Sequence, residues 1–168
     1  MLSMYDATIT PLKRALSNLA TILKKGEAYA DTKKIEHSVI LNARLFPDMY
    51  PLTRQVQIAT DMSKGAAARL AGVEIPKYED NETTFAELQA RIAKTIAFID
   101  SIQPAQLEGA ESRDIVITVR KIDLHFTGQA YLLNWVNPNV YFHVATAYNI
   151  LRHNGVELGK SDFLGPRK

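Results

Sequence analysis

This chain of 168 residues contains no cysteine, which excludes disulfide bonds, thiolate nucleophiles and cysteine-ligated zinc sites. It also lacks any run of about 18 apolar residues, the length that a membrane-spanning helix needs. Its first residues do not show the charged start and continuous apolar segment of a signal peptide. We therefore expect a cytoplasmic protein with no membrane partner.

A strong excess of either charge is absent as well. Lys and Arg number 20 against 18 Asp and Glu, and the two signs are interspersed along the chain. Nucleic-acid-binding proteins concentrate positive charge on one face, and a helix-turn-helix needs a basic recognition helix. Neither the second nor the last predicted helix below is basic, so we expect no nucleic-acid partner.

The chain length is typical of one domain. A domain of this size buries about two thirds of the surface that its unfolded chain exposes, so it needs no metal or disulfide to be stable. The sequence shows no internal repeat and no low-complexity segment. We therefore expect residues 1–168 to form a single domain.

Apolar periodicity predicts a first helix near the N-terminus. Between residues 5 and 25, apolar side chains recur at spacings of three and four, which places them on one face of a helix. Lys24 and Lys25 suit the negative C-terminal end of a helix, and we expect this helix to end at Gly26. Residues 27–46 are mixed in character, and we interpret them as a connector with local structure.

Two further helices are bounded by recognisable end signals. The second covers residues 52–71 and is predicted to end at Gly72. The third begins after Thr84, where Glu87 three residues later completes a capping box, and it stops before Pro104.

Between residues 113 and 126, apolar and polar residues alternate, so the hydrophobic period is two residues, as in a β-strand, and no longer that of a helix. This alternation predicts a small β-hairpin. Its turn falls at Arg120-Lys121, which is not the Asn-Gly pair that favours a two-residue turn, so the register stays open.

The last helical region contains the best-delimited helix of the chain. Residues 129–136 form one helical run, and Asn137 and Pro138 suit the N-cap and first position of another. Gly155 suits the left-handed conformation that ends a helix. We therefore expect a break at residue 137, with His143 in the first turns of the final helix.

Together these elements predict a mainly α four-helix bundle with a β-hairpin between the third and fourth helices.

The segment after this helix carries Gly159-Lys160-Ser161. Without the preceding glycine loop and strand, this triplet does not indicate a phosphate site. We predict instead that the tail folds back and buries Phe163 and Leu164 against the bundle or a second copy of it.

Several motifs along the chain resemble a known family. They are Pro47-Asp48-Met49-Tyr50-Pro51-Leu52, Gln55-Val56-Gln57, Ala68-Arg69-Leu70-Ala71-Gly72, the segment from Tyr148 to Val156, and Gly159-Lys160 with Asp162-Phe163-Leu164-Gly165. These motifs resemble an uncharacterised bacterial and fungal family of the DinB and YfiT-like four-helix superfamily. The resemblance covers essentially the whole chain and implies a DinB-like four-helix bundle.

The resemblance also implies where a functional site would lie. Active superfamily members bind a divalent metal through one histidine on the second helix and an H-x-x-x-H pair on the fourth, and several transfer low-molecular-weight thiols. His143 corresponds to the second histidine of that pair, and Asn139 stands in place of the first. The second helix has no histidine, and Gln55 and Gln57 are the polar residues nearest its inward face. A degenerate metal site is therefore implied.

Three roles for His143 stay open at this stage. The first role is that of a hydrogen-bonded interior histidine, and the second is the polar anchor of a small-molecule pocket. The third is the ligand of a divalent metal such as zinc or nickel. A metal would need further ligands, for which Asp48 and Asp61 are available. We assign no cofactor beyond this metal alternative.

The candidate ligand-pocket residues are His143, Asn139, Tyr50, Gln55 and Tyr148. Their side chains can hydrogen-bond a polar ligand, but they include no evident nucleophile or tuned acid–base pair, so we assign no catalytic residue. We expect a small-molecule-binding or interaction protein that forms a homodimer, because superfamily members often pair through helix faces. The alternative is a divalent-metal-dependent enzyme related to low-molecular-weight thiol transferases, and whether the protein is an enzyme stays open.

Overall fold

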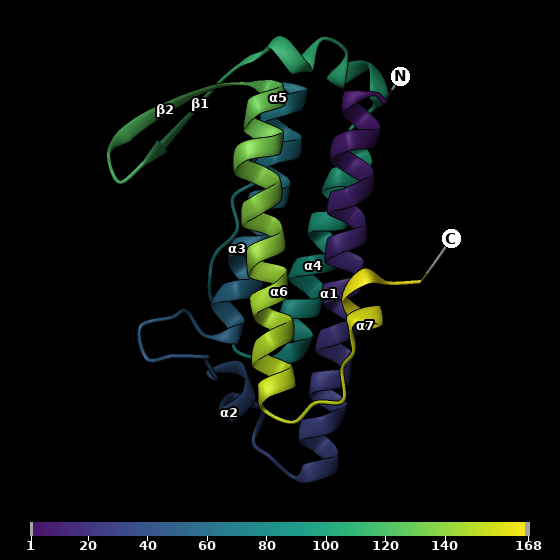
Figure 1. Ribbon diagram of the computed structural model, residues 1–168, viewed down its shortest axis with the longest axis vertical. Helices are drawn as coiled ribbons and strands as arrows, with labels where there is room; N and C mark the ends of the chain where they lie inside the picture. Colours follow the sequence, from purple (N-terminus) through teal and green to yellow (C-terminus); the bar gives the residue numbers. More distant parts are fainter. Residues whose placement is uncertain (1, 167–168) are drawn as a thin grey trace.

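The computed structural model describes residues 2–166 and shows a bundle of four long helical rods (Figure 1). The first three rods are α1 (Met4–Lys33), α3 (Leu52–Ala71) and α4 (Phe85–Ser101). The fourth rod joins α5 (Gly128–Tyr131), a π-helical segment (Leu132–Val136) and α6 (Asn137–His153). The shorter elements are α2 (His37–Leu41), two single-turn 3-10 helices (Pro104–Leu107 and Ala110–Ser112), β1 (Asp114–Val119), β2 (Ile122–Thr127) and α7 (Lys160–Leu164).

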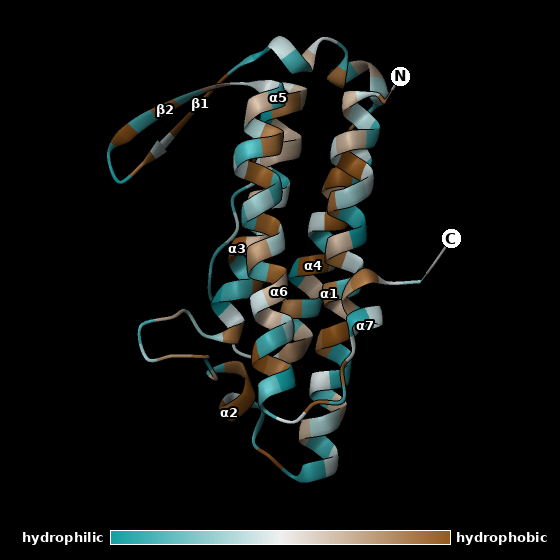
Figure 2. Ribbon diagram, in the orientation of Figure 1, coloured by the Kyte–Doolittle hydropathy of each residue, from teal (hydrophilic) through white to brown (hydrophobic). Residues whose placement is uncertain are grey.

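Each long helix contributes one apolar face to a shared core. α3 packs against both α4 and α6, and α1 packs against the same two helices from the other side. Polar and apolar bands alternate along the long helices in Figure 2, as expected when one face of each is buried. The predicted mainly α bundle with a late hairpin is therefore confirmed.

Local signals place the ends of α3 and α4 where the sequence predicts them. The Thr84 hydroxyl accepts a hydrogen bond from the Glu87 backbone N–H, and the Glu87 carboxylate accepts one from the Thr84 N–H. This reciprocal capping box starts α4. Gly72 adopts φ of +70° and ends α3.

The predicted end of the first helix at Gly26 is wrong. α1 continues through this residue to Lys33, and Lys34 provides the left-handed cap. Gly26 is buried, and a Cβ atom added there would lie 2.8 Å from Cδ2 of Leu151 on α6. The glycine therefore permits close approach of two helices.

The predicted break at Asn137 is also wrong. Asn137 has helical backbone angles, and the cap lies at Thr127, whose hydroxyl accepts a hydrogen bond from the Ala130 N–H at 3.3 Å. Pro138 has no N–H for the helical ladder, and its ring crowds the preceding turn. The wider π-helical segment just before it accommodates this local conflict. His143 therefore lies in the middle of a long helical rod.

The hairpin has a defined register. β1 and β2 pair antiparallel with Ile115 opposite Phe126, and they extend sideways from one end of the bundle (Figure 1). Arg120 and Lys121 have φ of 49° and 68°, so both turn residues are left-handed. A two-residue turn of this kind matches the twist of the strands, although its residues are unusual for it.

None of the helices formed by residues 2–166 has both the length and the apolar character required to cross a bilayer.

Candidate functional site

His143 lies on the side of α6 that faces α3, and only 9% of its surface is exposed. Its Nδ1 atom is 2.7 Å from Oε1 of Gln55, which is in the first turn of α3. The packing of α3 against α6 therefore brings together two of the residues that the sequence singled out.

The direction of this hydrogen bond follows from a second one. Nε2 of Gln55 donates to the backbone carbonyl of Tyr50 at 3.0 Å, which orients the amide with its oxygen toward His143. Because an amide oxygen can only accept, Nδ1 of His143 must carry the proton. In a neutral imidazole, Nε2 then holds a free lone pair.

The imidazole is held in its neutral form. Burial lowers the pKa of His143 below its ordinary value of 6.5, and the positive charge of Arg54 lowers that pKa further. No residue that the structure describes hydrogen-bonds to Nε2. Among the described residues, Thr8 Oγ1 is the only fully buried side-chain polar atom without a partner, so Nε2 retains contact with solvent.

The other predicted pocket residues are placed differently. The Tyr50 side chain is largely exposed, and its ring centroid lies 6.0 Å from the Arg54 guanidinium carbon. Nδ2 of Asn139 donates to the carbonyl of Trp135 at 2.7 Å, so this amide is turned back along its own helix. The ring of Tyr148 lies 6.4 Å from that of Phe163, on the side of α6 that faces α7. The structure thus joins Gln55 directly to His143, uses the Tyr50 carbonyl to orient the Gln55 amide, and places Tyr148 elsewhere.

The donor set around His143 does not fit the three-histidine metal site that the superfamily resemblance implies. Residues 2–166 include no group of three His, Cys, Asp or Glu side chains that could hold a metal ion. The Gln55 oxygen is engaged by His143, and Asp61 pairs with Arg91 at 2.7 Å. One imidazole nitrogen beside neutral amides falls short of the three or four ligands of a protein zinc site.

A second polar cluster, which the sequence reasoning missed, surrounds Arg91 of α4. This side chain is fully buried, with Nη1 2.9 Å from Oε1 of Glu82 and Nη2 2.7 Å from Oδ1 of Asp61. Nη2 also lies 3.0 Å from Oδ1 of Asp80, and Nε donates to the hydroxyl of Thr60 at 2.7 Å. The available signal was an arginine three residues after Leu88, on the inward stripe of a predicted helix.

This cluster extends toward His143 through two residues of α3. Nε2 of Gln57 donates to Glu82 at 2.9 Å, and Nη1 of Arg54 donates to Oε1 of Gln57 at 3.1 Å. Arg54 also forms an ion pair with Asp80. The segment that contains Asp80 and Glu82 is therefore fastened across α3 and α4, and it holds the cation whose charge acts on His143.

The pKa values of Glu82 and Asp80 are both lowered, so these two carboxylates stay ionised. Burial by itself raises the pKa of Glu82, but hydrogen bonds from Arg91 and Gln57 outweigh it and lower the pKa overall. Burial likewise acts to raise the pKa of Asp80, and the charges and hydrogen bonds of Arg54 and Arg91 lower it. Ionised side chains are usually found in a protein interior only when they are paired and hydrogen-bonded in this way.

Comparison with known proteins is consistent with this architecture. Residues 4–164 match a domain of unknown function, DUF1993. No protein with curated annotation matches the sequence. A crystal structure of a DinB family member protein from Shewanella denitrificans is 43% identical to this chain, with a TM-score of 0.92, and the match covers 98% of this chain and 93% of that one. The family match spans nearly the whole chain, and the protein therefore belongs to the DUF1993 family of DinB-like four-helix proteins.

Proposed function

We propose that this protein binds a small polar molecule whose hydrogen-bond donor meets Nε2 of His143. The observation that supports this proposal is a buried, neutral imidazole held by Gln55, whose Nε2 has no hydrogen-bond partner among the described residues. A histidine needed only for packing would be expected to have both ring nitrogens satisfied inside the protein.

The surroundings of Nε2 favour one class of ligand. An unprotonated imidazole nitrogen accepts from a hydroxyl or amide N–H. The nearby positive charge of Arg54 disfavours cationic ligands and favours neutral or anionic ones. We therefore propose a small neutral or anionic compound that carries a hydroxyl or amide group.

The alternative is a divalent-metal-dependent enzyme related to low-molecular-weight thiol transferases. It would require His143 to recruit ligands beyond the amides that now surround it. Because the donor set does not fit such a site, we propose that the metal site of the superfamily is degenerate in this chain and that ligand binding does not require zinc or nickel.

The test uses untagged protein with nitrogen-15-labelled histidine. A panel of small alcohols, amides and carboxylic acids, together with glutathione, is titrated while the imidazole resonances are recorded. We expect at least one compound to bind saturably and to shift Nε2 of His143. His143→Ala should abolish that binding, and His125→Ala on the exposed face of the hairpin should leave it unchanged.

Two results would count against the proposal. The first is binding that survives His143→Ala, and the second is a panel in which no compound perturbs the His143 resonances. Calorimetric titration with zinc and nickel tests the alternative. Stoichiometric metal binding that is lost in His143→Ala would favour the enzyme.

We also propose that the protein forms a homodimer, on the basis of the superfamily resemblance. Light scattering at micromolar concentrations tests this, and a monomer throughout that range would contradict it.

A further inference from the structure

A groove is lined by residues of α1, α6 and α7. Its volume is about 580 Å³, and the residues that matter below are Arg14, Ala15, Tyr141, Val144, Phe163 and Leu164. This volume is within the range of about 300–1,000 Å³ that is usual for small-molecule sites. His143 does not line the groove, because its ring faces α3.

The floor and walls of the groove are mainly apolar. The small side chain of Ala15 on α1 leaves room beside Val144 on α6. Tyr141 is 43% exposed and Leu164 is 49% exposed, although both border the same hollow. Contiguous apolar surface of this kind, when it remains open to water, is typical of a site for an apolar ligand group.

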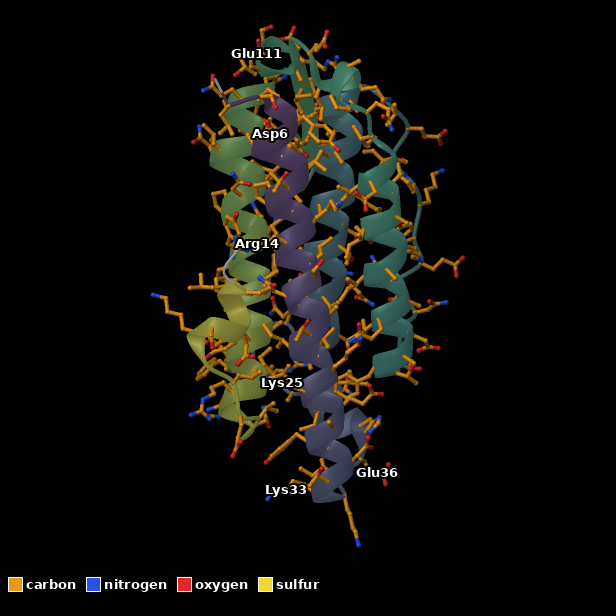
Figure 3. All side chains as sticks on the ribbon, turned by 90° about the vertical axis from the view of Figure 1, so that its right-hand side faces the viewer. Asp6, Arg14, Lys25, Lys33, Glu36 and Glu111 are labelled. Atoms are coloured by element: carbon orange, nitrogen blue, oxygen red, sulfur yellow. The ribbon has the colours of Figure 1, made fainter. Side chains whose placement is uncertain are left out.

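One edge of the groove is positively charged. Nε and Nη2 of Arg14 donate to the carbonyl of Leu164 at 3.0 and 2.8 Å, and Figure 3 shows Arg14 on α1. No carboxylate in residues 2–166 pairs with this guanidinium. Its charge is therefore available to an anionic group at the edge of the apolar groove.

Polar contacts help to attach the wall formed by α7. Lys25 pairs with Asp162 at 2.7 Å, and Nδ2 of Asn18 donates to the carbonyl of Phe163 at 2.9 Å. Gly165 has φ of +73°, and a Cβ atom there would lie 2.3 Å from Oδ1 of Asn18. No residue of α7 is fully buried, so Phe163 packs only partly and Leu164 is not buried against the bundle. Burial of Leu164 against a second copy stays a prediction.

We propose that this groove binds a single-chain amphipathic carboxylate, with its tail along Ala15 and Val144 and its carboxylate on Arg14. The apolar lining matches an unbranched hydrocarbon chain, and the arginine at one edge matches a carboxylate. A second observation supports this occupant: the groove volume of about 580 Å³ is enough for one short hydrocarbon chain.

The probe is sodium octanoate, added to the full chain and followed by calorimetry and amide chemical shifts. We expect saturable binding with shifts concentrated at Ala15 and Val144. Arg14→Gln should weaken octanoate binding by about tenfold, because a charge-assisted hydrogen bond is lost. Arg14→Lys should restore part of that loss, and Lys33→Gln, which removes a cation from the far end of α1, should change nothing.

Further ligands and variants test the apolar lining and the Arg14 guanidinium separately. 1-Octanol should bind wild type and Arg14→Gln equally, and acetate should not bind. Tyr141→Ala, at a half-exposed position, should weaken the binding of both octanoate and 1-octanol. His143→Ala should leave octanoate binding unchanged, so failure of the His143 proposal would not affect this one.

Three outcomes would overturn the assignment. They are octanoate binding that is insensitive to both Arg14→Gln and Tyr141→Ala, no saturable binding at millimolar octanoate, and Arg14-dependent sedimentation with phosphatidylglycerol vesicles. The last result would assign the surface to a bilayer instead of a free carboxylate.

Discussion

Arg91 and Glu82 form an ion pair that is almost excluded from water. Nη1 of Arg91 lies 2.9 Å from Oε1 of Glu82, and the two side chains are 0% and 6% exposed. Glu82 lies in the segment between α3 and α4, whereas Arg91 lies within α4. This contact and the one to Asp80 fasten the segment to α4, and the contact between Arg91 and Asp61 joins α4 to α3.

Arg91→Met should therefore be strongly destabilising. Removal of the guanidinium leaves the nearly buried carboxylate of Glu82 without its cation, which costs about 3–5 kcal/mol of unfolding free energy. Urea unfolding followed by circular dichroism measures the change. Lys94→Met, at an exposed cation of the same helix, should cost less than about 1 kcal/mol. Equal effects of the two variants would show that Arg91 does not organise the cluster.

The neutral state of His143 predicts a pH dependence of stability. Its pKa is lowered in the folded protein, so below its ordinary value of 6.5 the unfolded chain binds a proton that the folded chain does not. Stability is therefore complete above that value and should fall as the pH drops from about 7 to about 5. His143→Gln should flatten this part of the profile of unfolding free energy. His125→Gln, at an exposed histidine, should follow the wild-type curve, and matching curves for all three proteins would contradict the assignment.

Gln55→Glu should raise the pKa of His143. A carboxylate facing Nδ1 would stabilise the imidazolium, which the neutral amide does not do. Titration of the His143 ring signals by NMR measures the shift. Gln129→Glu, at an exposed position of α5 far along the same helical rod, provides a control. A His143 pKa that is the same in Gln55→Glu as in the wild-type protein would mean that the contact at 2.7 Å does not control the ring.

Two buried threonines should respond oppositely to the same substitution. Thr8 Oγ1 is fully buried and has no partner, so Thr8→Val removes an unsatisfied hydroxyl at nearly constant volume. We expect a gain of about 1 kcal/mol in unfolding free energy. Thr60→Val removes the acceptor for Nε of Arg91 and should cost about 1–3 kcal/mol. Urea unfolding of both variants checks the pair, and destabilisation by Thr8→Val would indicate a partner that the contacts do not show.

The helix ends show where sequence reasoning is dependable. At Thr84 and Gly72 the signal and its effect lie within one turn, so the residues themselves encode the boundary. Gly26 and Pro138 carry equally strong signals but lie inside continuous helical rods. Gly26 lets α1 pack closely against Leu151 because it has no Cβ atom, and the π-helical segment accommodates Pro138. Local breaking signals are overridden when the bundle gains more from a continuous apolar face.

At the candidate site too, the sequence identifies residues, but only the packing of the helices decides their contacts. Sequence singled out His143, Gln55 and Asn139, but it could not show that the Gln55 oxygen meets Nδ1 or that Asn139 turns back to Trp135. Arg91 was overlooked because its partners come from α3 and from the segment before α4. The periodicity of one helix does not show which residues of other elements will pair with its side chains.

By itself, the sequence determined the class of fold, the hairpin and the ends of α3 and α4, because periodicity, capping and turn preferences act over a few residues. Only the tertiary structure decided which ring nitrogen of His143 stays free, since its partner is 88 residues away in the chain. The Arg91 cluster and the groove beside Arg14 also exist only after the helices assemble. Charge pairing, burial and cavity shape depend on distances that no local pattern encodes.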